Sequence, residues 1–209
     1  GADLTDAQKQ TMMKYFNVSS DQVQVMTITN EDEHKHLDNI APQSQIGSRT
    51  LSCAYVKPTQ SGGIKVRTAN LNWVTGNMIA TTLSTSGVKN CEVVAACPME
   101  VSGTGALTGI QMAYEKASGE KLDETKTKLA NQEIVTTGEL ADKVGKNEAT
   151  TVVNQSKMDV IQNGVQNADE IQNIVIIVAE QNYISVSQVD FVRIVSLLKQ
   201  ISQQDYNYD

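Results

Sequence analysis

Apolar residues recur at helical spacing in some stretches of the first 120 residues and alternate with a period of two in others. Thr5 and Gln8 form a capping box before apolar residues at helical spacing, which predicts a helix ending near Asn17. Alternation then predicts a strand over Val23–Thr29. The elements expected next are a short helix from Asn30, strands over Thr50–Val56 and Ile64–Ala69, a helix from about Trp73 to Val88, a strand over Val93–Ala96, and a helix from Thr108 or Gly109 to Gly119.

This order of elements predicts an α+β fold. The strands over Thr50–Val56 and Ile64–Ala69 flank a turn at residues 58–63 and are expected to pair as a hairpin. Pro98 is expected to end the last strand, because proline donates no hydrogen bond to a ladder. Residues 1–120 are therefore expected to form an open mixed sheet of about four strands with helices on one face.

Residues 121–209 show helical spacing only, and we expect a helical C-terminal region that packs on or beside the sheet domain. Its first segment continues from Asp123–Asn131 into Glu133–Lys143, with only Gly138 intervening. The expected helices cover Asp123–Lys143, Glu148–Asn163 and Ala168–Gln181, followed by a last helix whose core-facing stripe is Val189, Val192, Val195, Leu198 and Ile201.

Composition and charge exclude several classes of protein. The chain has 209 residues, of which 40% are hydrophobic and 20% charged, as in ordinary globular proteins. A net charge of -7, with one Trp and two Phe, disfavours nucleic acid as a partner. The longest apolar run, Ile174–Ala179, is much shorter than the roughly 20 residues of a membrane span. The chain opens on a helix start without a signal peptide, so a mature form is expected if the protein is exported.

The cysteines and histidines give weak signals for metal or redox chemistry. Cys53, Cys91 and Cys97 contain no C-x-x-C pair, and both free thiols and a Cys53–Cys97 disulfide are compatible with the pattern. His34 and His36 fall in the short predicted helix, where residues two apart point to different sides. We therefore expect no metal and no cofactor.

A glycine-rich loop between the last strand and its helix is the strongest candidate site. Such a loop directs unpaired backbone N–H groups and the positive end of a helix dipole at one point, which suits a small anionic ligand. The spacing is neither the dinucleotide fingerprint nor the P-loop, and the glycines equally suit close packing of strand and helix. The candidate ligand-binding residues are Ser102, Gly103, Thr104, Gly105, Thr108 and Gly109.

Five segments, distributed along nearly the whole chain, resemble one known family. They are Ile28–His34, Ser44–Arg49, Asn70–Thr75, Val101–Gly109 and Thr137–Ala141. Together they are similar to the family called domain of unknown function 1002, the YpuA-like exported proteins of Firmicutes. The resemblance implies a secreted or cell-envelope protein of a Gram-positive bacterium. It implies no catalytic residue, because no activity is established for that family.

The leading hypothesis is a non-catalytic module that binds a small anionic or polymeric ligand, or a cell-surface or host partner, through the glycine loop and the adjoining sheet edge. The alternative is a hydrolase, because the order of elements also resembles ribosomal protein S5 second-domain-like folds of the Lon type. Ser102 or Thr104 would then be the nucleophile, and Lys143 or Lys146 the general base, within hydrogen-bond reach. A third hypothesis makes an exposed Val189–Ile201 stripe an interaction platform. The sequence predicts no oligomeric state.

Overall fold

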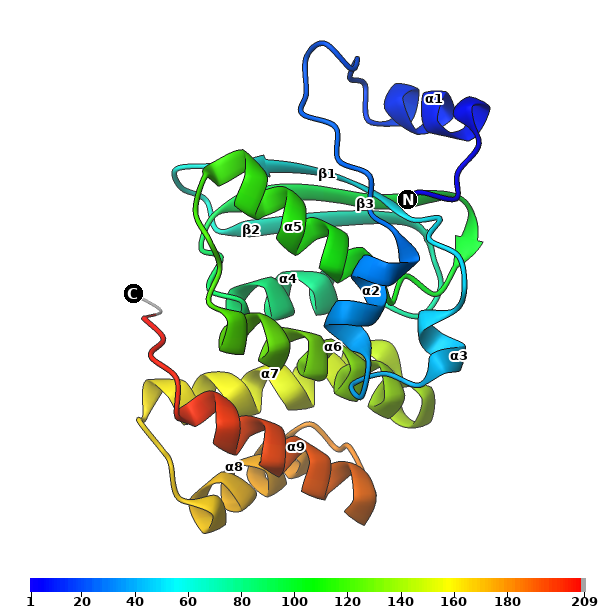
Figure 1. Cartoon of the computed structure of the whole chain (residues 1–209). Coiled ribbons are helices and arrows are strands. Elements are labelled where there is room, and N and C mark those ends of the chain that lie inside the picture. The colour runs from blue at the N-terminus through cyan, green and yellow to red at the C-terminus, as the bar shows by residue number, and fades with distance from the viewer. Residues whose placement is uncertain (208–209) are drawn as a thin grey trace.

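The computed structural model describes residues 1–207 and shows a three-stranded sheet with nine helices in that range (Figure 1). The strands are β1 (Cys53–Pro58), β2 (Ile64–Leu71) and β3 (Cys91–Val101). The helices are α1 (Asp6–Tyr15), α2 (Asn30–Leu37), α3 (Gln43–Ile46), α4 (Gly76–Thr85), α5 (Ala106–Ser118), α6 (Glu124–Val144), α7 (Lys146–Gln162), α8 (Ala168–Gln181) and α9 (Gln188–Ser202). The α+β class and the helical C-terminal region agree with the sequence.

The strand order is β1-β3-β2, so the predicted hairpin is wrong. β1 runs antiparallel to β3, with Cys53 opposite Ala96, and β2 runs parallel to β3, with Ile64 opposite Cys91. The helix α4 makes the crossover between the two parallel strands. The reason lies in β3, whose near-continuous apolar run is buried on both faces and therefore belongs at the centre of the sheet.

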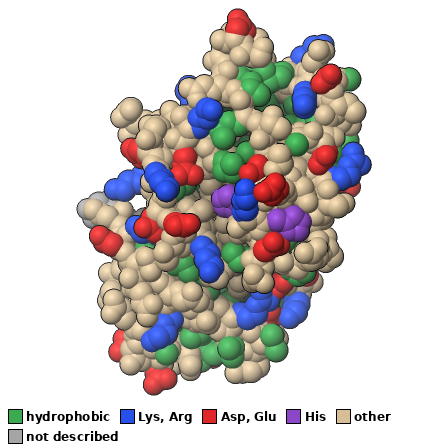
Figure 2. Space-filling model, viewed as in Figure 1, with side chains coloured by type: hydrophobic (Ala, Val, Ile, Leu, Met, Phe, Trp, Pro, Cys, Tyr) green, Lys and Arg blue, Asp and Glu red, His purple; other side chains and the backbone are tan. Residues whose placement is uncertain are grey.

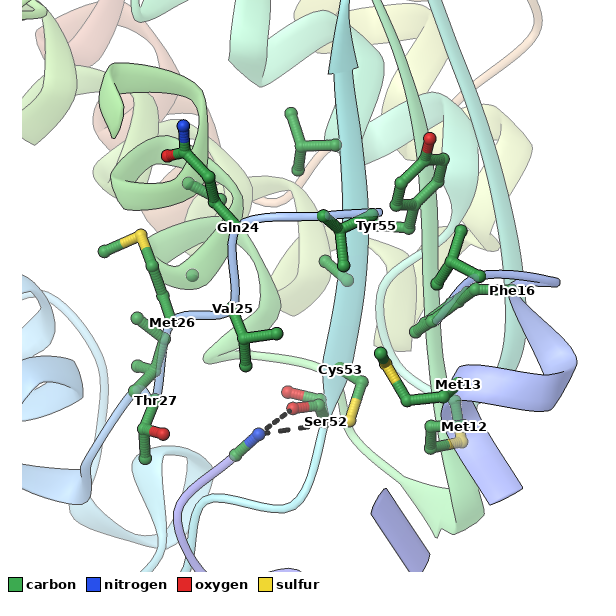
Figure 3. A pocket seen from close by; sticks show the side chains of 18 of the residues that line it. Met12, Met13, Phe16, Gln24, Val25, Met26, Thr27, Ser52, Cys53 and Tyr55 are labelled. Atoms are coloured by element: carbon green, nitrogen blue, oxygen red, sulfur yellow. Dashed lines mark hydrogen bonds between the residues drawn. The ribbon is translucent and has the colours of Figure 1, made fainter. Parts of the chain in front are cut away.

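The sheet has three strands, because the predicted strand over Val23–Thr29 does not form. The 18–29 segment instead runs beside β1, where Figure 3 shows Gln24 to Thr27 next to the strand. Its one backbone bond to residues outside the stretch 13–33 is from Ala2 N–H to the Ile28 carbonyl, within the described residues. Alternating apolar residues need only one side of the segment to face the protein. A β-strand also needs a neighbouring strand within hydrogen-bonding distance, and within residues 1–207 the 18–29 segment has none.

Pro98 lies inside β3, contrary to the prediction that it ends the strand. The pairing of β3 with β1 reaches only to Ala96, so the missing N–H of Pro98 falls beyond that ladder. The pairing with β2 is irregular between Ala69 and Leu71. There Asn70, at a φ of 61°, donates from its side chain to the Cys97 carbonyl at 2.8 Å.

Helices lie on both faces of the sheet, which corrects the prediction of one covered face. α4 and α5 pack on one face, and α1 lies beyond the other (Figure 1). The ring of Phe16, just after α1, stacks on Tyr55 of β1 with centroids 6.3 Å apart. Adjacent β1 residues point to opposite faces, so Ala54 and Val56 are turned towards α5.

The C-terminal helices form a layer below α4. α6 is one continuous helix through Gly138, as expected. One core of buried residues runs from Trp73 through β3 and α4 to Ile201 of α9. The predicted stripe of α9 is buried only from Val195 onwards, since Val189 and Val192 are 67% and 56% exposed. Within residues 1–207 no helix is both long and apolar enough to cross a membrane.

Candidate functional site

The glycine loop joins β3 to α5 and is held tightly against residues 71–74. Gly103 has a φ of 84°, and a Cβ there would lie 2.7 Å from Cγ2 of Val74. The carbonyl of Ser102 accepts hydrogen bonds from the backbone N–H groups of Trp73 and Val74, both at 3.2 Å. Glycine is therefore needed at 103 for the backbone conformation and for the close approach of the two segments.

A carboxyl group of the chain itself lies at the N-terminus of α5. A Cβ on Gly105 would lie 2.0 Å from Oε1 of Glu33, a side chain that is 3% exposed. The side-chain amide of Asn30 donates to Glu33 at 3.4 Å. Burial raises the pKa of Glu33, and hydrogen bonding to its neighbours opposes this rise. The space beside Gly105, where the sequence predicts a small anion, thus holds Glu33.

The predicted hydroxyl groups bond within the loop. Ser102 Oγ and Thr104 Oγ1 are 3.1 Å apart, and the Thr104 N–H donates to Ser102 Oγ at 3.4 Å. Thr104 and Thr108 are buried, and Thr108 Oγ1 has no partner among the described residues. Gly109 faces Ile28, whose Cγ1 would be in ordinary contact with a Cβ at 109. The six candidate residues are therefore neighbours, and three of them, Gly103, Thr104 and Thr108, are buried.

The side-chain amines of the two candidate lysines, Lys143 and Lys146, bind groups outside the glycine loop. Lys143 Nζ lies 2.7 Å from Oδ2 of Asp190 on α9, and Lys146 Nζ donates to the Asn72 carbonyl at 2.7 Å. In the described part of the chain, neither amine is hydrogen-bonded to Ser102. Among the described residues, the amines of both lysines thus bond to groups other than the hydroxyls of Ser102 and Thr104.

The electrostatics of Asp190 fit a structural role for its ion pair. Burial by itself would raise the pKa of Asp190, but hydrogen bonds from Lys143 and Ser187 bring this pKa below its usual value. Ser187 is the N-cap of α9, and its hydroxyl accepts from the Asp190 N–H. The pair therefore ties the end of α6 to the start of α9.

Both histidines of α2 make contacts within the helix or with its C-cap residue. His34 Nδ1 is 2.7 Å from Asp38 Oδ1, and His36 Nδ1 is 2.8 Å from the Asp32 carbonyl oxygen. Across residues 1–207, no three His, Cys, Asp or Glu side chains are grouped to hold a metal ion. The three cysteines are free thiols.

The structure reveals a cavity of about 580 Å³ along the outer edge of β1, which sequence reasoning missed. We call it the β1 pocket. Its walls are α1, the 18–29 segment, β1 and α5 (Figure 3). Its volume falls within the roughly 300–1,000 Å³ of small-molecule sites. Its apolar lining includes Met12, Met13, Phe16, Val25, Met26, Ala54, Val56 and Ala113.

Figure 2 shows the molecule in the same view as Figure 1, with its side chains coloured by type. Hydrophobic side chains gather there in the upper part of the view, around the 18–29 segment and α1. Val25 is 62% exposed on this segment. The sequence held one signal for the pocket, the methionines at 12, 13 and 26, but only the fold brings α1 and the 18–29 segment to the same strand.

Comparison with known proteins identifies the family. The model of the family described as "Protein of unknown function (DUF1002)" matches residues 1–209. The chain belongs to this family. A similar relative is the uncharacterized protein YpuA of Bacillus subtilis (strain 168), which is 36% identical over 210 residues, covering all of this chain and 72% of the relative. No solved structure matches the chain.

The segments that suggested the DUF1002 family from sequence are linked in space through the glycine loop. Asn30 donates from its side chain to the Gly47 carbonyl at 3.2 Å, and Glu33 lies against Gly105. Trp73 bonds to the loop through its backbone and packs its ring on Gly138 of α6. All five segments therefore belong to one junction. The inner end of the β1 pocket, at Glu33 and Gly105, borders it.

Proposed function

We propose that this DUF1002 protein is an exported, non-catalytic binding module of the bacterial cell surface, and that the β1 pocket takes an elongated apolar ligand. The observation that carries the binding role is the pocket itself, an open apolar cavity between a sheet edge and a helix. The family resemblance supports the proposed export and the proposed location at the cell surface.

The lining of the β1 pocket supports an apolar ligand of variable shape. Met12, Met13 and Met26 offer flexible, polarizable side chains that adapt to different partners. Phe16 and Tyr55 add an aromatic pair on the same side. In the lining, the one acidic side chain is the buried Glu33, so no carboxyl pair is available for acid–base chemistry.

Binding of the fluorescent probe anilinonaphthalene sulfonate tests this function. The variant Ala113→Leu fills the cavity from α5, where Ala113 is half-buried and lines the pocket. We expect the wild-type protein to bind the probe and Ala113→Leu to bind it at least tenfold more weakly, because added methylenes occupy the ligand space.

Ala168→Leu is the matched control, since Ala168 begins α8 and does not line the pocket. It should bind the probe as the wild type does. Equal binding by all three proteins would place the probe elsewhere and contradict the proposed site. Absence of binding to the wild type would contradict it as well.

A further inference from the structure

We propose that the ligand of the β1 pocket is an extended peptide segment that adds to the outer edge of β1 as a fourth strand. This inference rests on the proposed binding function and names the class of its ligand. Sheet edges bind extended peptides through main-chain hydrogen bonds, with side chains fitting alternate pockets.

The first observation is the free edge of β1. β3 pairs with only one side of β1, so alternate residues of Cys53–Val56 turn their N–H and C=O groups away from the sheet. Among the described residues, no backbone group of 53–58 is hydrogen-bonded outside the ladder with β3. These outward groups lie along the β1 pocket. They match the backbone of a further strand.

The facing wall is also unpaired. Within residues 1–207, no backbone hydrogen bond involves Val23–Thr27, which lines the pocket opposite β1. Figure 3 shows this stretch running beside β1 with Val25 directed towards the strand. A peptide seated between the two walls meets unpaired donors and acceptors on both of its edges, whereas a lipid chain would leave them unpaired.

The two edges of the sheet differ in protection. β2, at the other edge, carries exposed Lys65 and Arg67, and charges of this kind discourage a further strand. In β1 the residues Cys53–Val56 are uncharged, and Lys57 and Pro58 stand only at the end of the strand. Four residues therefore remain open to pairing, over about 13 Å of strand.

The β1 pocket has room for side chains on both faces of an added strand. On the α5 side the pocket is lined by Gly109 and Ala113, whose small size leaves space for larger peptide side chains. On the α1 side it is lined by Met12, Met13 and Phe16. Since strand side chains alternate between faces, apolar residues are accepted at consecutive peptide positions.

The exposed charged residues that line the β1 pocket, here called its rim, are basic and favour a negatively charged peptide. Lys9, Lys57 and Lys116 line the pocket and are exposed, while its one lining acid, Glu33, is buried. This basic rim stands out in a chain with 24 acidic and 17 basic residues. Acidic residues beside the apolar stretch of the peptide are therefore favoured.

The test uses the whole chain and a synthetic heptapeptide of two aspartates followed by alternating valine and threonine. Amide hydrogen exchange is measured by NMR with and without the peptide. We expect amides in Cys53–Val56 and Val23–Thr27 to exchange at least tenfold more slowly in the complex, because new backbone hydrogen bonds protect them.

A second peptide of the same sequence, N-methylated at every valine and threonine, keeps the side chains and loses the donors. It should bind at least tenfold more weakly, and exchange at both walls should stay fast. A third peptide with lysines in place of the aspartates should also bind more weakly at low salt, because the rim is basic.

The outcomes separate this inference from the proposed function. If the fluorescent probe binds at the pocket but the exchange of β1 is unchanged by the peptide, or the methylated peptide binds equally well, the added strand is wrong and the apolar pocket stands. If neither probe nor peptide binds, the proposed function fails and this inference fails with it.

Discussion

The indole ring of Trp73 lies directly against the Cα of Gly138 on α6. A Cβ at 138 would be 2.5 Å from Cζ2 of the ring, and the indole N–H donates to the carboxylate of Asp142 one turn further on, at 3.2 and 3.3 Å. Trp73 also bonds to the glycine loop through its backbone. This contact therefore locks the sheet, the loop and the C-terminal helices together.

Gly138→Ala is expected to destabilise the protein by about 1–3 kcal/mol, because a methyl group placed in the ring forces the indole or the helix to move. The sign of this change in the free energy of unfolding is informative, because alanine in a helix interior is normally more stable than glycine by about 1 kcal/mol. Urea unfolding, followed by the fluorescence of Trp73, measures the difference.

Gly109→Ala is the matched control on α5. A Cβ there meets Ile28 Cγ1 at 3.5 Å, an ordinary contact. This variant should be as stable as the wild type or more so. Equal stabilisation by both substitutions would show that the ring does not restrict residue 138.

Glu33→Gln is expected to raise the melting temperature at pH 8 by about 2–4 °C, the effect of roughly 1 kcal/mol in a protein of this size. Burial raises the folded-state pKa of Glu33 above its ordinary value, so the folded protein holds this proton more tightly than the unfolded chain. The associated stability is present below the ordinary pKa and is lost as pH rises through the folded pKa. At pH 4 the gain should vanish.

Glu31→Gln provides the comparison on the same helix. Glu31 is exposed and pairs with Lys35 at 3.3 Å. Thermal melts of this variant between pH 4 and pH 8 should follow those of the wild type. A pH-dependent gain of the same size in both variants would assign the effect to net charge.

Iodoacetamide at pH 8 is expected to label Cys53 and to spare Cys91 and Cys97 in the folded protein. Burial raises the pKa of Cys91 to about 11, and burial also raises the pKa of Cys97, so both thiols stay protonated and covered. Cys53 is half-buried in the wall of the β1 pocket. Mass spectrometry should show one modification, and three after denaturation. Rapid labelling of Cys91 in the folded state would contradict its burial.

Lys157→Met is expected to cost about 3–5 kcal/mol, because it leaves the Glu133 carboxylate buried without its cation. Lys157 Nζ lies 3.1 Å from Glu133 Oε2, both side chains are 1% exposed, and the amine also donates to the Thr81 carbonyl and to Thr85 Oγ1. Urea unfolding measures the loss.

The double variant Lys157→Met with Glu133→Leu tests the same pair. Replacing both charges by apolar groups should recover most of the stability. Thr85 keeps a hydrogen bond to the Thr81 carbonyl in that variant. A double variant as unstable as the single one would show that the charges themselves stabilise the junction of α4, α6 and α7.

Local features could be predicted from the sequence because their interactions span only a few residues. The capping box of Thr5 and Gln8 forms as expected, and Gly119 ends α5 at a φ of 74°. The long helix α6 is also where the sequence places it, whereas α5 begins at Ala106, before the predicted start at Thr108 or Gly109, so Thr108 and Gly109 lie in the helix and not in the loop. Each is decided by contacts within about four positions along the chain.

The order of the strands and the β1 pocket depend on tertiary structure. Nothing near Val23–Thr29 in sequence shows that β1 would pair only with β3, or that this alternating stretch would stop short of the sheet. The position of Glu33 beside Gly105 likewise depends on residues 72 positions apart. The sequence determined most of the elements and the family, and long-range packing determined the sheet order, the absence of a strand over residues 23–29, the packed state of the loop and the free edge of β1.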